Sequence, residues 1–166
     1  MILNSAILTG ALELLPHSLA TMAIIPVQLR MVYRIGQQHG FELSRGHIQD
    51  FLATVGVGLT SQMVEGFARK LMGNVARTLG GRLLGGVAST ATGSAVAFGV
   101  TYALGQVAKK YYEAGRSLSA AQLREVFSSL LNEGNSLQQR YTNQIVDKSR
   151  HIEAADLVSL VKGSGG

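Results

Sequence analysis

The chain has 166 residues, of which 15% are charged, and it carries a formal net charge of +5. The charged fraction lies below the roughly 25% of ordinary soluble domains, and mean hydropathy is +0.21. This composition argues against a disordered chain and favours a membrane-associated or densely packed helical protein. The absence of cysteine excludes disulfides and thiolate metal sites. Because Lys and Arg are scattered, no nucleic-acid partner is expected.

The N-terminal part, residues 2–29, is apolar and contains the only two prolines, Pro16 and Pro26. Each proline removes a backbone donor and can break or kink a helix. We therefore expect two short helices or one bent helix, with Pro16 opening the second of two. The helical pattern then continues to about residue 38, and Gly40 predicts its end.

The next predicted helix begins at Arg45, capped by Ser44, and follows an apolar stripe to about Leu71. Residues 72–82 contain several glycines and predict a turn. Four residues near this helix start carry carboxylate or imidazole groups, which are typical metal ligands: His39, Glu42, His47 and Asp50. Because the first two precede the helix, we interpret the group as a polar surface and predict no metal site.

The longest apolar segment is the 26-residue run from Leu83 to Ala108, which contains no formal charge. As a helix it would be about 39 Å long, and a bilayer core requires about 30 Å. Small residues recur at every fourth position, which places them on one helical face where another helix can approach closely. We call this set the small-residue stripe, a glycine-zipper pattern formed by Gly81, Gly85, Ser89, Gly93, Ala97, Thr101 and Gly105.

The central run has two interpretations. It is rich in Gly, Ala, Ser and Thr, which contribute little to membrane insertion, so a lone helix would insert only marginally. The run therefore either enters or adheres to a bilayer, or forms the buried helix of a soluble bundle. The exit sequence Lys109 to Tyr112 fits a basic and aromatic membrane belt, or else an ordinary amphipathic helix end.

The C-terminal part is more polar. Gly115 predicts the end of the central helix, and Ser119 with Gln122 forms a capping-box pattern that opens a helix to about Asn132. Gly134 predicts a break, and a short amphipathic segment follows from His151. No strand pattern is present. The sequence thus predicts an all-α bundle of hydrophobic helices around the stripe-bearing helix, with a hydrophobic domain at 1–132 and a polar helical tail at 133–166.

Three blocks of the sequence resemble the bacterial family called domain of unknown function 697, the YcjF-like group. The blocks are hydrophobic and glycine patterns within residues 6–130: Leu14-Leu15-Pro16 with residues 28–35 and His39-Gly40, then Gly80–Gly93, then residues 101–105 with Tyr111-Tyr112 and Gly115. The resemblance implies an all-helical, membrane-associated module found beside GTPases and without an accepted catalytic activity. The chain departs from the pattern at His17 and Ser18, where an acidic residue is expected, and it contains no phosphate-binding GxxxxGK[ST] loop.

The function expected from these features is that of a non-enzymatic, membrane-associated helical module that anchors or regulates a partner. The alternative is a soluble all-α domain for interaction or self-assembly. We predict no catalytic residue, no cofactor site and no metal site. The expected partners are a GTPase, membrane lipid and further copies of the chain. The expected location is the bacterial inner (cytoplasmic) membrane or its surface, and the alternative is the cytoplasm.

Overall fold

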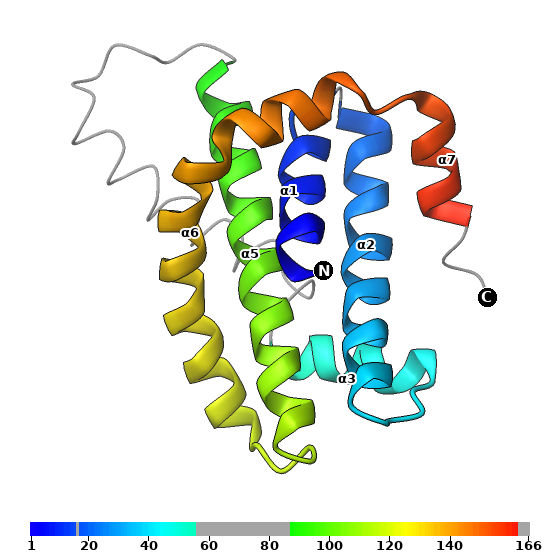
Figure 1. The fold of residues 1–166 in the computed structure, drawn as a ribbon, viewed down its shortest axis with the longest axis vertical. Helices are drawn as coiled ribbons and strands as arrows, with labels where there is room; N and C mark the ends of the chain where they lie inside the picture. The colour runs from blue at the N-terminus through cyan, green and yellow to red at the C-terminus, as the bar shows by residue number, and fades with distance from the viewer. Residues whose placement is uncertain (16, 56–86, 163–166) are drawn as a thin grey trace.

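The computed structural model describes residues 1–15, 17–55 and 87–162 of the chain (Figure 1). Within those ranges it contains six α-helices and no strand, so the prediction of an all-α fold is confirmed. The helices are α1 (Ile2–Leu12), α2 (His17–Gln38), α3 (Arg45–Val55), α5 (Val87–Glu113), α6 (Ala120–Arg150) and α7 (Ala154–Lys162).

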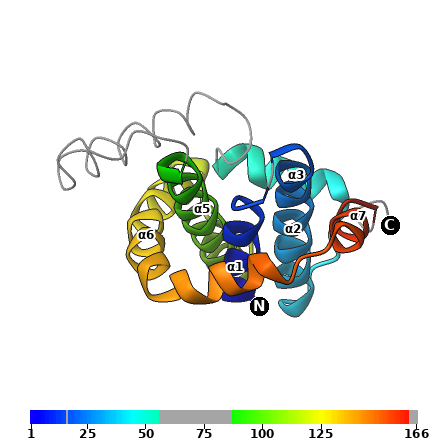
Figure 2. The same ribbon diagram turned by 90° about the horizontal axis from the view of Figure 1, so that it is seen from above.

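Helix α5 lies at the centre of the bundle and packs against α1, α2 and α6. Figures 1 and 2 show α6, α5, α1 and α2 side by side, with α3 crossing at the lower end and α7 beside the upper half of α2. Helix α1 contacts α2 and α6 as well as α5. The C-terminal helix α7 packs against α2.

Among the described residues the apolar core has a lower part, an upper part and a third cluster where α7 meets α2. The lower part joins α2, α3 and α5 through side chains such as Met31, Phe51 and Leu104. The upper part joins α1, α5 and α6 through Phe98 and Ile145, which are 0% and 1% exposed. Burial of such side chains contributes about 1.5–3 kcal/mol each, so the longest helices are held mainly by tertiary packing.

The chain breaks after α1, and α2 continues through Pro26, so one helix covers the second proline. The expected division into two helices is confirmed, since α2 begins at His17, and Pro26 lies inside the second of them. Proline removes one backbone hydrogen bond, but the buried residues Val27 and Met31 that follow it pack into the core and offset that loss. The predicted stop at Gly40 is confirmed, because α2 ends at Gln38 and Gly40 has a φ of +79° that favours glycine.

Helix α6 begins with the predicted capping box: the Ser119 hydroxyl accepts from the Gln122 backbone, and the Gln122 side chain accepts from the Ser119 backbone. It then runs without a break to Arg150, so the predicted end near Asn132 and the break at Gly134 are wrong. The boundary between the two predicted domains falls inside this helix. Ile145, beyond that boundary, packs in the same cluster as Phe98.

Part of the predicted organisation lies outside the described residues. The predicted helix from Arg45 is present to Val55, where α3 ends. Its expected end at Leu71, the turn at 72–82 and the first four residues of the charge-free run belong to the undescribed range 56–86.

Within the described residues, no helix combines the length and the apolarity needed to cross a bilayer.

Candidate functional site

Four members of the small-residue stripe lie on the described part of α5 with their surroundings defined: Gly93, Ala97, Thr101 and Gly105. Ser89 belongs to α5, but its side chain is not described, and Gly81 and Gly85 lie outside the described residues. The four defined positions face α1, the segment after it, and α2.

The middle of the stripe carries a buried polar network. The Thr101 hydroxyl is 0% exposed and accepts a hydrogen bond from the Gln28 amide nitrogen on α2 at 3.0 Å. The Thr9 hydroxyl on α1 lies 2.9 Å from Thr101 Oγ1 and 3.2 Å from the carbonyl oxygen of Ala97. A buried polar group without a partner costs about 1–3 kcal/mol. This network therefore fixes the register of α1 and α2 on α5.

The two glycines at the ends of the defined stripe differ in how tightly they are packed. A Cβ atom on Gly105 would lie 2.7 Å from Ile2 Cγ2 and 3.0 Å from Met31 Sδ. A Cβ atom on Gly93 would meet the carboxylate of Glu13, with Oε2 at 3.1 Å. The neighbours at both positions are side-chain atoms, which can move more readily than a helix backbone.

A close helix crossing lies on another face of α5, and the sequence analysis did not predict it. A Cβ atom on Gly134 of α6 would lie 3.0 Å from both the Cα and the carbonyl oxygen of Gly99 on α5. Two glycines thus allow α5 and α6 to approach backbone to backbone. The Ser94 hydroxyl of α5 donates to the Gly10 carbonyl oxygen of α1 at 2.8 Å.

The histidine and carboxylate residues near the start of α3 do not converge. His39 Nε2 lies 3.8 Å from Glu113 Oε1, whereas His47 Nδ1 accepts from the Ser44 backbone nitrogen at 3.2 Å. Among the described residues, no three His, Cys, Asp or Glu side chains are close enough to hold a metal ion.

The aromatic exit of α5 is largely part of the core. Tyr112 is 3% exposed and contacts the rings of Phe41 and Phe51, with centroids 5.4 and 6.1 Å away. Burial, with a smaller contribution from Tyr111, raises the pKa of Tyr112 to about 12. A membrane belt formed by both tyrosines is therefore wrong for Tyr112, whereas the alternative of an amphipathic helix end fits its burial.

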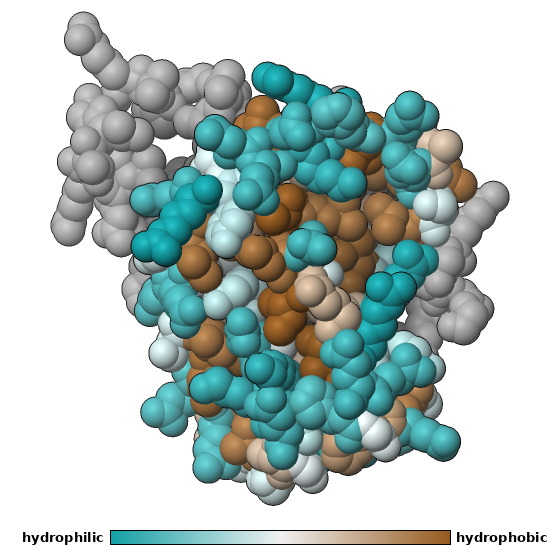
Figure 3. Space-filling view, viewed as in Figure 1, coloured by the Kyte–Doolittle hydropathy of each residue, from teal (hydrophilic) through white to brown (hydrophobic). Residues whose placement is uncertain are grey.

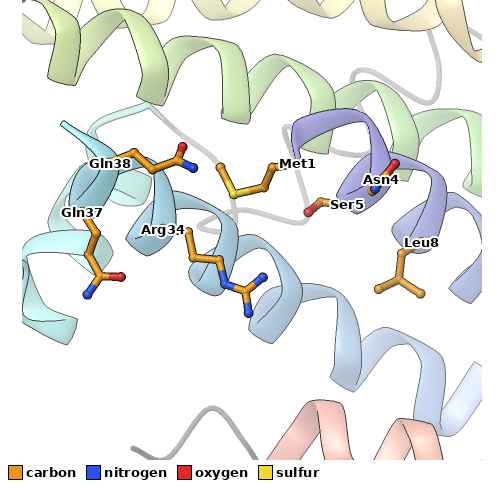
Figure 4. Close-up of a pocket in the computed structure, with 7 residues that line it drawn as sticks. All are labelled: Met1, Asn4, Ser5, Leu8, Arg34, Gln37 and Gln38. Carbon is orange, nitrogen blue, oxygen red and sulfur yellow. The ribbon is translucent and has the colours of Figure 1, made fainter.

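An open hollow of about 630 Å³ separates the lower part of α2 from α1 (Figure 4). We call it the α1–α2 hollow, and its lining combines apolar, hydroxyl, amide and guanidinium groups: Met1, Asn4, Ser5, Leu8, Arg34, Gln37 and Gln38. Figure 3 shows apolar residues gathered on this face, inside a hydrophilic border. The sequence could not predict this hollow, because its lining residues, such as Leu8 and Arg34, come together only when α1 and α2 lie side by side.

No protein-family model, curated protein or solved structure matches the chain. The resemblance to domain of unknown function 697 therefore stays a prediction.

Proposed function

We propose that this chain is a non-enzymatic helical module that binds a protein partner through the face shared by α1 and α2. The observation that carries the proposal is the α1–α2 hollow. It is open, and it presents apolar carbon from Leu8 and Met1 beside hydrogen-bonding groups from Arg34 and Gln38. A combination of apolar surface with a few polar groups is suited to recognition of a protein segment.

The rim of the hollow supports the same proposal. Tyr33 is 38% exposed, and its hydroxyl accepts a hydrogen bond at 2.9 Å from the amide nitrogen of Gln37, which lines the hollow. Tyrosine and arginine are enriched among residues that dominate binding energy at protein interfaces. Arg34 is exposed and lines the hollow, so this face offers a tyrosine and an arginine within one turn of α2.

The small-residue stripe has a different role in this proposal. Its defined members contact α1, the segment after α1, and α2, so they hold the bundle together and a partner meets the outer face of the same two helices. Membrane association, a GTPase partner and self-association, which the sequence predicts, remain proposals that no contact in the described residues addresses. Flotation of the full chain with anionic vesicles tests the first of these separately.

Photo-crosslinking in cells tests the proposed binding face. A benzoyl-phenylalanine is placed at Gln37 in the hollow or, as the matched control, at Gln139, which is exposed on α6. We expect a discrete protein adduct from the Gln37 position and none from Gln139. Equal adducts at both positions, or no adduct at Gln37, Gln38 and Asn4, would overturn the assignment of this face.

A further inference from the structure

The C-terminal helix α7 sits on the upper end of the same α1–α2 face. Leu157 is 7% exposed and packs in a cluster with Leu12, Ala23 and Val27, and Leu160 is partly buried against the same cluster. On the outer side of α7, Val158 is 44% exposed. The face thus already holds one amphipathic helix, whose apolar side chains are three residues apart in the manner of a helix bound in a groove.

The surface under α7 and the α1–α2 hollow form one continuous surface along α2. Ala23 and Val27 lie under α7, and Arg30 donates from Nη2 to the Ser159 carbonyl oxygen at 3.4 Å. Further along α2, Arg34 and Gln38 lie at the same helical spacing and line the open hollow. Leu8 of α1 belongs to both regions. This surface is therefore mainly apolar around Leu157, and where it is open it is mostly polar with one guanidinium group, that of Arg34.

Helix α7 is weakly attached for an element of the core. It has nine residues, and helices of that length are unstable in isolation. Leu157 is buried, and among the described elements α7 packs mainly against α2, with Leu12 of α1 in the same cluster. Only residues 151–153 connect it to α6. A competing helix therefore has to displace few contacts.

We propose that the α1–α2 face is a helix-binding groove that α7 occupies within the chain, and that its partner is an amphipathic helix longer than α7 with an acidic end. Figure 1 shows α7 and α2 running in the same direction. Since Ser159 lies opposite Arg30, a residue one turn beyond Ser159 would lie opposite Arg34. An acidic residue there pairs with the exposed guanidinium. The inference rests on the proposed function, and it specifies the partner.

Peptide binding to the full-length chain tests the groove. The probe is a fluorescein-labelled peptide with the sequence of residues 152–162 followed by Glu-Glu-Ala, and its control ends in Gln-Gln-Ala. Replacing Leu157 with Ala weakens α7 as the internal competitor, so the apparent Kd of the probe should fall by about tenfold or more. Val158→Ala, on the exposed side of α7, should change it less than about twofold. Leu160→Ala replaces Leu157→Ala if circular dichroism shows that the latter fails to fold.

The acidic extension has its own readout. With Leu157→Ala as the background, the Glu-ended probe should bind about two- to fivefold tighter than the Gln-ended probe, and Arg34→Gln should remove that difference. Equal binding of the probe to Leu157→Ala, Val158→Ala and the unaltered chain overturns the groove. A dimer that forms by exchange of α7 between copies, and that Leu157→Ala abolishes, assigns the groove to a second copy and overturns the partner helix. If either of these two results is obtained while the photo-crosslinker at Gln37 still gives a protein adduct in cells, the proposed function holds and only the groove proposal fails.

Discussion

Replacement of Gly134 with alanine should destabilise the bundle, whereas the same replacement at Gly93 should not. Both glycines lie inside long helices, so alanine gains about 0.5–1 kcal/mol of helix stability at each position. The difference between the two variants therefore reports packing alone. At Gly134 the new Cβ would meet the Gly99 backbone at 3.0 Å, and at Gly93 it would meet the end of the Glu13 side chain at 3.1 Å.

The backbone of α5 cannot move away without disturbing its contacts with α1 and α2, so overpacking at Gly134 should cost about 1–3 kcal/mol. At Gly93 the new Cβ meets the end of a side chain, which yields by a few tenths of an ångström more readily than a helix backbone, so Gly93→Ala should be close to neutral. We expect the free energies of unfolding to differ by about 1–3 kcal/mol, which corresponds to roughly 2–12 °C in Tm for a chain of this length. Urea unfolding and thermal circular dichroism measure the difference. Equal stabilities of the two variants would refute the close crossing of α5 and α6.

Three further outcomes follow from the packing of named side chains. Thr101→Val should lower stability by about 1–3 kcal/mol in urea unfolding, because it leaves the buried Gln28 amide without its acceptor, while Thr142→Val on the exposed side of α6 should be close to neutral. Burial raises the pKa of Tyr112 from 10.0 to about 12, so its contribution to stability is complete below about pH 10 and is lost as the pH rises towards 12. Tyr112→Phe should therefore flatten the alkaline decline in the free energy of unfolding. An unchanged pH profile would contradict the burial of the hydroxyl. Truncation after Asn132 should unfold or aggregate the chain, because it removes Ile145 and Tyr141 from the cluster around Phe98, whereas truncation after Arg150 should retain the helical circular dichroism signal.

The sequence predicted the helix ends that local chemistry decides. Ser119 with Gln122, Gly40 and Gly115 each act through backbone groups a few residues away, so their roles can be inferred without knowledge of the fold. Gly134 could not be interpreted in this way. A glycine inside a helical pattern ends the helix or admits a close neighbour, and the choice here depends on Gly99 in a different helix.

The candidate site was less predictable than the fold. The four-residue spacing placed Gly93, Ala97, Thr101 and Gly105 on one helical face, but it did not reveal that Thr9 and Gln28 would meet the middle of that face. The α1–α2 hollow depends on two helices whose lining residues follow no common sequence pattern. The exposed Arg34 of α2 could be assigned to a surface hollow only once the fold placed Leu8 of α1 in the same lining.

The reactivity of cysteines introduced at two positions tests the central claim most directly. This claim is that the small-residue stripe lies inside the bundle and that the outer face of α1 and α2 binds the partner. The chain has no cysteine, so Ala97→Cys and Gln37→Cys each provide a single thiol. In the purified native protein, the thiol at position 97, where alanine is 8% exposed, should react with maleimide orders of magnitude more slowly than the thiol at position 37. In cells that contain the partner, the thiol at position 37 should become protected as well. Rapid labelling at position 97 in the native protein, or labelling at position 37 that is equally fast in cells, would contradict this account.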